Sequence, residues 1–300
     1  MSFTSRKSSL TIILIILIPI AGISGWLISK SVMKSGETYQ LNIEGSTTVF
    51  KIIEESSAVF SQYHPGVDVT VSGTGTGAGI TALIDGQADI GMASRPVKDE
   101  ENTSSGGTLK AYAIAKDGLA IIIHASANPL DITLDIARAI FNGTISDWIN
   151  PLLSSTSLTG TIQVVVREAG SGTRDAFNEI VMGDEKQLEV GSAYVSNAIQ
   201  KSSNQLIVDA VANNPNYIGY VGLGYIDETV DAVSINGIEP TIETIQDGSY
   251  DIQRELYLVT KTNPEGLVKE FINWTFSPEG QSIVVETGFI NVAATTEEIY

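Results

Sequence analysis

No cysteine occurs among the 300 residues, and histidine occurs only twice, at His64 and His124. The absence of cysteine excludes disulfide bonds, thiolate metal sites, thiol catalysis and a lipid anchor attached to cysteine. Two separated histidines exclude a histidine-rich metal centre, and we expect neither a metal nor another cofactor. His64 precedes Pro65 between an expected helix and an expected strand, so we expect it at the surface.

Basic residues are scarce, because 17 Lys and Arg stand against 35 Asp and Glu, for a net charge of −18. A nucleic-acid partner is therefore not expected, since phosphate backbones are bound by a high density of Lys and Arg. Hydrophobic residues make up 43% of the chain, which allows a sizeable core and excludes a fully disordered chain. The length corresponds to about two average domains.

Long hydrophobic runs are absent except for one near the N-terminus. Residues 10–28 carry no charge and have two basic residues on each side. Such a run can form a helix of roughly 20 residues that spans a bilayer, and no good small-residue cleavage site follows it. We therefore expect residues 1–36 to form a signal anchor and a linker that attach the chain to the membrane. The rest of the chain would lie at the outer face of the cytoplasmic membrane, and a cleaved export signal followed by secretion is the alternative.

From residue 41 onward, strand patterns alternate with helical patterns. Leu41–Ile43, Val67–Val71 and Ile162–Val166 are expected strands, and each is followed by a turn and then by apolar residues at helical spacing. This alternation is typical of an α/β fold with mainly parallel sheets.

Glycine and hydroxyl residues fill three of these turns, at residues 45–48, 72–79 and 167–173. Unpaired N–H groups and the positive dipole end make a helix start a site for anions, and Ser, Thr and Gly add donors and close approach. Each turn alone is most simply a helix cap, and none is a P-loop, because Ile80 stands where Lys is required. Together the three turns predict a site for a tetrahedral oxyanion, with Arg167 as a bidentate donor.

Five motifs in consistent order over about residues 40–293 resemble the phosphate-binding proteins of ABC transporters. They are Gly45–Val49, Asp89–Arg95, Arg167–Asp175, Ile218–Gly222 and Phe276–Ile290. The resemblance implies a type II periplasmic-binding-protein fold, in which two α/β lobes joined by two crossover strands close on a ligand in the cleft.

The resemblance also implies where the lobes divide. Residues 40–121 and 255–300 would form lobe 1 and residues 122–254 lobe 2, with crossovers near Ala120–His124 and Leu256–Thr260. The first two turns would then lie on lobe 1 and the third on lobe 2, so that a bound anion bridges the lobes.

A set of phosphate ligands follows from the same resemblance. Arg167 would be the cationic clamp, and Gly172 would act through its backbone. Thr76 takes the place of a family serine, with Gly77 as the alternative after a one-residue shift. Arg95 is either a second cationic clamp or a surface residue paired with the acids of residues 99–101. The full set is Ser46, Thr47, Thr48, Thr76, Ser94, Arg95, Arg167, Ser171, Gly172 and Thr173.

A carboxylate that many family members carry in the cleft is missing from the matching positions. Ser94 or Arg95 stands at one position, and Ala169 stands at the other, two residues after the clamp. A cleft carboxylate accepts the proton of a phosphate ion and rejects sulfate, which carries none. Glu168 and Asp175 lie close enough in sequence to replace it, although Asp175 also suits the start of its helix.

The resemblance thus implies a monomer that binds inorganic phosphate, delivers it to the permease subunits of an ABC transporter and does no chemistry on it. The alternatives are another tetrahedral oxyanion (sulfate, molybdate or tungstate), a membrane-bound phosphate sensor, and a phosphohydrolase or phosphotransferase with Ser171 or Thr47 as nucleophile. Such an enzyme needs a base or a metal to activate the hydroxyl, and the sequence contains no HxH, DxD or HExxH-like cluster.

Overall fold

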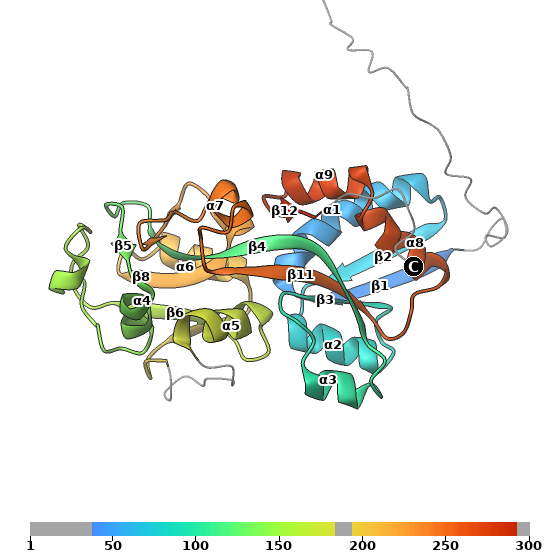
Figure 1. The fold of residues 1–300 in the computed structure, drawn as a ribbon, viewed down its shortest axis with the longest axis horizontal. Helices are drawn as coiled ribbons and strands as arrows, with labels where there is room; N and C mark the ends of the chain where they lie inside the picture. The colour runs from blue at the N-terminus through green and yellow to red at the C-terminus, as the bar shows by residue number, and fades with distance from the viewer. Residues whose placement is uncertain (1–37, 184–193, 293–300) are drawn as a thin grey trace, which may run out of the picture. The chain divides into compact units, whose positions relative to one another are not determined.

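The computed structural model describes residues 38–183 and 194–292, which form two α/β lobes that share two long strands (Figure 1). The signal anchor predicted over residues 1–36 lies outside the described residues. Among the described helices, none is both long enough and apolar enough to cross a bilayer.

Lobe 1 contains the first part of the described chain and its C-terminal helices. Its elements are β1 (Tyr39–Gly45), α1 (Thr47–Tyr63), β2 (Val67–Ser72), α2 (Thr76–Ile84), β3 (Ile90–Ala93), α3 (Asp99–Ser104), α8 (Gly266–Thr275), α9 (Pro278–Glu286) and β12 (Ile290–Asn291). Strand β1 pairs in parallel with β2 on one side and with β3 on the other. This order brings the turns that follow β1 and β2 to the same edge of the sheet.

Lobe 2 is formed by the middle of the chain. Its elements are β5 (Asp131–Ile132), α4 (Leu134–Phe141), η1 (Pro151–Leu153), β6 (Gln163–Arg167), α5 (Gly172–Phe177), η2 (Asn178–Met182), β7 (Ile199–Lys201), α6 (Asn204–Ala212), β8 (Tyr217–Gly222), η3 (Leu223–Tyr225), β9 (Val230–Ala232), β10 (Ser234–Ile235) and α7 (Ile242–Gln246). Strand β6 pairs in parallel with both β7 and β8, so the turn after β6 leaves the sheet at the edge that faces lobe 1.

Two long strands, β4 (Lys110–His124) and β11 (Gln253–Thr260), connect the lobes (Figure 1). They pair antiparallel from Lys110 and Thr260 to Gly118 and Gln253, and β11 also pairs with β3. Beyond Gly118, β4 leaves β11 and pairs with β8 of lobe 2. This is the predicted two-lobed α/β architecture with two crossover strands, whereas the exact lobe boundaries proposed from the sequence stay a prediction.

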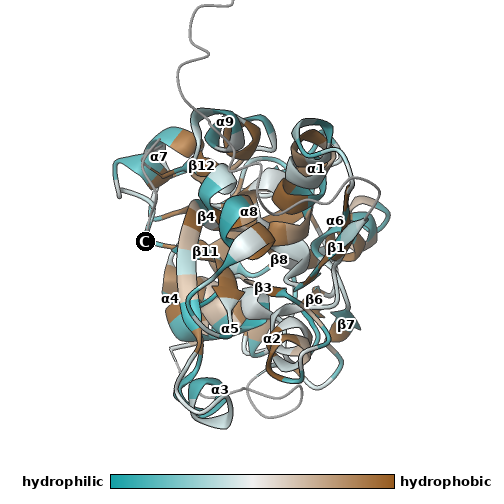
Figure 2. Ribbon diagram, turned by 90° about the vertical axis from the view of Figure 1, so that its right-hand side faces the viewer, coloured by the Kyte–Doolittle hydropathy of each residue, from teal (hydrophilic) through white to brown (hydrophobic). Residues whose placement is uncertain are grey.

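Each lobe has its own large hydrophobic core. In lobe 2, Phe177 stacks on Tyr220 at 3.9 Å between ring centroids, and Phe141 meets Phe177 edge-on at 4.7 Å. In lobe 1, Phe60 packs edge-on against Phe271 at 5.0 Å. Figure 2 shows the hydrophobic residues along β4 and β11, whereas α3 is hydrophilic. Separate cores let each lobe keep its shape while the two connecting strands set the position of one lobe against the other.

The expectation that His64 lies at the surface was wrong. Its ring stacks on Phe60 at 3.8 Å, and Nδ1 lies 2.9 Å from the Phe60 carbonyl oxygen. The imidazole therefore closes the end of α1 over the lobe 1 core.

Helix α2 packs unusually close to β1 at Gly79. A Cβ atom at this position would lie 2.3 Å from both the Glu44 carbonyl oxygen and the Gly45 Cα. Because backbone atoms of a central strand cannot move aside cheaply, this contact requires glycine.

We predict that Gly79→Ala lowers the free energy of unfolding by about 1–3 kcal/mol, the usual scale for overpacking. The clash outweighs the roughly 1 kcal/mol by which alanine is favoured over glycine inside a helix. Urea denaturation measures the loss. Gly73→Ala is the control, since its Cβ would approach side chains no closer than 3.4 Å. Equal stability of the two variants would contradict the close packing of α2 on β1.

Candidate anion-binding site

The three predicted turns meet between the lobes, and two of them carry helix caps. Ser46 Oγ accepts hydrogen bonds from the backbone N–H groups of Thr48 and Val49, at 3.2 and 3.4 Å. Ser171 Oγ accepts from Arg174 N at 3.3 Å. A capping hydroxyl uses its oxygen as an acceptor and keeps its proton for another partner. Both residues thus act as caps, and their role as anion ligands stays a prediction.

The Thr48 hydroxyl connects the two lobes. Its Oγ1 lies 3.1 Å from Thr173 Oγ1 and accepts hydrogen bonds from Asn204 Nδ2 at 2.8 Å and from Arg254 Nη2 at 3.1 Å. Thr48 belongs to α1 of lobe 1, whereas Thr173 and Asn204 begin helices of lobe 2. All four side chains are buried. The sequence did not predict that Asn204 and Arg254 belong to this site.

Arg254 is held by a buried ion pair with Asp117 on the two crossover strands. Arg254 Nε and Nη2 donate to Asp117 Oδ2 at 3.0 and 2.8 Å, and Asp117 Oδ1 accepts from Leu223 N at 3.0 Å. Asp117 has no exposed surface, and burial raises the pKa of its carboxyl while Arg254 acts against that rise. No clear sequence signal marks this pair, because Lys116 precedes Asp117 and Glu255 follows Arg254.

Arg167 is the cation that the third turn contributes. Only 1% of it is exposed, and its Nε and Nη2 donate to the Glu168 carboxylate at 2.9 and 2.8 Å. Its Nη1 is buried and has no hydrogen-bond partner among residues 38–183 and 194–292, and the same is true of Thr47 Oγ1. A guanidinium nitrogen can only donate, so two buried polar groups from opposite lobes remain available for an acceptor.

Thr76, Ser94 and Gly172 come close together where the second turn meets the third. Ser94 N donates to Thr76 Oγ1 at 3.2 Å, and the two hydroxyl oxygens lie 3.4 Å apart. A Cβ on Gly172 would lie 2.5 Å from Thr76 Oγ1 and 2.6 Å from Ser94 Oγ. Gly77 N donates to the Gly170 carbonyl at 3.0 Å. The alternative that places an anion on Gly77 N is therefore disfavoured, because that donor is already used.

Arg95 holds the lobes together through carboxylates. Its Nε donates to Asp175 Oδ2 at 2.8 Å, and its Nη1 and Nη2 donate to Glu101 at 2.9 and 2.7 Å. Lys98 Nζ also contacts Asp175 Oδ2, at 2.9 Å. Pairing with the acids of residues 99–101 was one of the two expectations, but the expected surface position was wrong, since only 5% of Arg95 is exposed. With these N–H groups engaged, Arg95 serves the contact between lobes, and anion binding by Arg95 is not supported.

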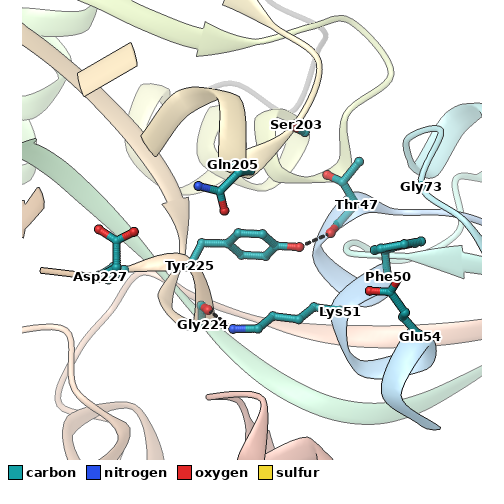
Figure 3. Close-up of a pocket in the computed structure, with 11 residues that line it drawn as sticks. Thr47, Phe50, Lys51, Glu54, Gly73, Ser203, Gln205, Gly224, Tyr225 and Asp227 are labelled. Atoms are coloured by element: carbon teal, nitrogen blue, oxygen red, sulfur yellow. Dashed lines mark hydrogen bonds between the residues drawn. The ribbon is translucent and has the colours of Figure 1, made fainter. Parts of the chain in front are cut away.

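A pocket of about 550 Å³ opens beside this site, between α1 and η3 (Figure 3). Thr47 lies at its wall, and the Tyr225 hydroxyl donates to the Thr47 carbonyl. Lys51 Nζ donates to the Gly224 carbonyl at 2.6 Å. Burial raises the pKa of Tyr225 to about 12, so this phenol remains a hydrogen-bond donor at neutral pH. Both bonds join lobe 1 to lobe 2.

The ten predicted site residues thus fall into four groups. Thr47 and Arg167 carry the unpaired polar atoms and Thr48 contacts Thr173 across the lobes, whereas Thr76, Ser94 and Gly172 form the neighbouring contact between the lobes. Ser46 and Ser171 cap the helices that carry them, and Arg95 is bound by carboxylates.

We predict that Asp117→Ala lowers the free energy of unfolding by about 3–5 kcal/mol, because Arg254 then stays buried without its counter-charge. Urea denaturation measures this loss. Asp135→Ala, which breaks an exposed pair with Arg138, is the control and should cost at most about 1 kcal/mol. A loss at Asp117 as small as the control's would show that the buried pair is not needed for stability.

A second prediction concerns Gly172. The Cβ of Gly172→Ala would clash with two hydroxyls of lobe 1, so the lobes cannot approach as closely, and affinity for a tetrahedral anion should fall at least about tenfold. Calorimetric titration with phosphate measures the affinity, and a thermal melt checks that the fold is kept. Unchanged affinity in a folded variant would contradict the role of this close approach.

Comparison with known proteins places the chain in a family. Residues 32–279 match the model of the PBP superfamily domain. The chain is 30% identical over 266 residues to the phosphate-binding protein PstS of Staphylococcus saprophyticus, with 82% of this chain and 78% of that protein covered. It is 28% identical to PstS of Bacillus subtilis, with 84% and 80% covered.

Solved structures agree with this placement. A phosphate ABC transporter substrate-binding protein from Clostridium perfringens, with bound phosphate, matches with a TM-score of 0.77 and 35% identity over 84% of this chain and 99% of that one. An ABC-type phosphate transport receptor from Vibrio cholerae matches with a TM-score of 0.68 and 30% identity, with 84% and 100% covered. The chain therefore belongs to the PBP superfamily and, within it, to the family of the PstS phosphate-binding proteins.

Proposed function

We propose that this protein binds inorganic phosphate between its lobes, outside the cytoplasm, and delivers it to the permease subunits of an ABC transporter. One observation carries the proposal. Thr47 Oγ1 on lobe 1 and Arg167 Nη1 on lobe 2 are buried polar groups without a hydrogen-bond partner in the described part of the chain. Leaving such groups unpaired is costly, and a phosphate oxygen is an acceptor that could pair with both.

Hydrogen bonds rather than net charge hold the anion in this proposal. The chain carries a net charge of −18, and Arg167 is already paired with Glu168. Hydroxyl groups and a guanidinium N–H that are fixed by the surrounding fold bind a tetrahedral oxyanion locally, where water is excluded. The C. perfringens relative, which holds phosphate, supports this choice of ligand.

The site offers little support for an enzyme that cleaves phosphate esters. Such an enzyme needs a base beside the attacking hydroxyl. Thr47 Oγ1 contacts no carboxylate or imidazole in the described structure, and Ser171 Oγ accepts from the backbone as a cap. The relatives in this family are named as binding proteins. We therefore propose binding and delivery without chemistry on the ligand.

We also propose that the protein acts as a monomer anchored in the cytoplasmic membrane by residues 10–28. This rests on the uncharged run and its basic flanks alone. The family's extracytoplasmic role in transport supports an outward-facing body.

We predict that Arg167→Ala weakens phosphate binding by about 2–4 kcal/mol, the scale for losing one partner of a buried charged contact. Calorimetric titration near pH 7 with phosphate, sulfate and molybdate measures it. Arg138→Ala is the control, because Arg138 lies on α4 and pairs with the exposed Asp135.

Three outcomes separate the possibilities. Tight binding of phosphate that Arg167→Ala weakens supports the proposal. Binding of sulfate or molybdate in place of phosphate would keep the site and change the ligand. No binding of any of these anions by the wild-type protein would refute the proposed function.

A further inference from the structure

Asn204 carries an acceptor that has no partner. It is fully buried at the start of α6, and its Oδ1 is one of the few buried side-chain atoms without a hydrogen bond in the described structure. Ser203 caps the helix by accepting from Leu206 N at 3.1 Å, so Asn204 is not needed as the cap. A carbonyl oxygen left unpaired in the protein interior is costly. The unpaired oxygen of Asn204 therefore points to a hydrogen-bond donor on a ligand.

The Asn204 amide turns its nitrogen toward Thr48, so its oxygen faces away from that hydroxyl. Arg254 can only donate, so it takes one lone pair of Thr48 Oγ1, and Asn204 Nδ2 takes the second at 2.8 Å. The proton of Thr48 then points to Thr173 Oγ1, at 3.1 Å. This leaves the Asn204 carbonyl oxygen as an acceptor and the Thr173 proton as a donor. Through Arg254, the orientation depends on Asp117.

Asn204 lies beside the groups that we assign to the anion. It contacts Thr48, the neighbour of Thr47, and Arg167 Nη2 approaches the Ser202 carbonyl at 3.4 Å, two residues before Asn204. Asn204 is thus linked, through Thr48 and through Ser202, to the neighbourhood of the residues that carry the unpaired Thr47 Oγ1 and Arg167 Nη1. The guanidinium can only donate and the hydroxyl can donate or accept, whereas the Asn204 carbonyl oxygen can only accept.

The carboxylates around the site are engaged by cations. Asp117 pairs with Arg254, Glu168 with Arg167, and Asp175 with Arg95 and Lys98. Glu168 is the nearest rival acceptor, since it is bound to Arg167 itself. Both of its oxygens already accept from that guanidinium, whereas Asn204 Oδ1 is an unpaired oxygen that can only accept.

We propose that Asn204 Oδ1 accepts the hydrogen bond of the P–OH group and thereby selects phosphate over sulfate. The inference rests on the proposed function and names the residue that replaces the missing cleft carboxylate. At neutral pH each inorganic phosphate ion keeps at least one hydroxyl, whereas sulfate has none. Sulfate would place an oxygen against an unpaired carbonyl oxygen, and this mismatch disfavours its binding.

The test compares the Kd values of phosphate and sulfate for the full-length protein and its variants, by calorimetry near pH 7. Asn204→Ala removes the acceptor, so the ratio of the sulfate Kd to the phosphate Kd should fall by roughly 10- to 100-fold. Asn178→Ala is a matched control, because Asn178 is also buried but contacts Tyr194 inside lobe 2. The control should keep the wild-type ratio.

Asn204→Asp is a second variant of the same shape. It offers only acceptors, so phosphate binding should persist while sulfate binding should be lost. Equal weakening of both anions in Asn204→Ala, or loss of both in Asn204→Asp, would show that the amide donates to the ligand and would overturn the inference. A ratio that changes in Glu168→Gln and not in Asn204→Ala would assign the acceptor to Glu168 instead. Absence of phosphate binding by the wild-type protein would refute the proposed function itself.

Discussion

The buried ion pair between Asp117 and Arg254 is the interaction on which the arrangement of the anion site depends. It joins the two crossover strands at the level where they pass from one lobe to the other. From there Arg254 reaches the Thr48 hydroxyl, and Asp117 holds the backbone at Leu223, where η3 begins. Removing two charges from water is expensive, so two apolar residues of similar volume would often stabilise the fold at least as well as this pair. In return the pair holds Arg254 where it donates to the buried Thr48 hydroxyl that connects the lobes.

Charge balance explains how an acidic protein can hold an anion. Arg95, Arg167 and Arg254 each have a carboxylate partner at 2.7–2.8 Å. The guanidinium groups are therefore rigid donors more than sources of net positive charge. A site of this kind does not attract anions from a distance, since the overall electrostatic field of the protein is negative. Its selectivity must come from the direction and number of its hydrogen bonds, which a fixed network supplies.

Local sequence patterns predicted much of this structure. Each glycine and hydroxyl turn lies between a strand and a helix as expected, because capping and glycine conformations depend on a few neighbouring residues. The third turn also supplied the buried cation Arg167. The family resemblance, carried by five motifs in order, gave the two-lobed fold that no single turn implies.

Contacts between distant segments were not predictable in the same way. Asp117 and Arg254 are 137 positions apart, and Asn204 lies 156 positions from Thr48. Nothing in their neighbouring residues says that these side chains meet. Arg95 illustrates the same limit, because its second partner, Asp175, comes from the other lobe. His64 was misplaced for a different reason, since a residue before proline in a turn is usually exposed, whereas stacking on Phe60 buries it here.

Contact between the lobes and ligand binding are coupled by the unpaired donors. Direct bonds such as Gly77 N to the Gly170 carbonyl and Arg95 to Asp175 hold the lobes together. The same approach buries Thr47 Oγ1 and Arg167 Nη1 away from water, and none of the described residues offers them an acceptor. The first set of contacts stabilises the closed arrangement, and the second destabilises it by the cost of two lost hydrogen bonds to water. An anion that accepts from both groups removes that cost, so it shifts the equilibrium toward closure by the difference in its affinity for the two arrangements. A ligand that fails to pair with every buried group recovers only part of this free energy, and for that reason closure itself contributes to selectivity.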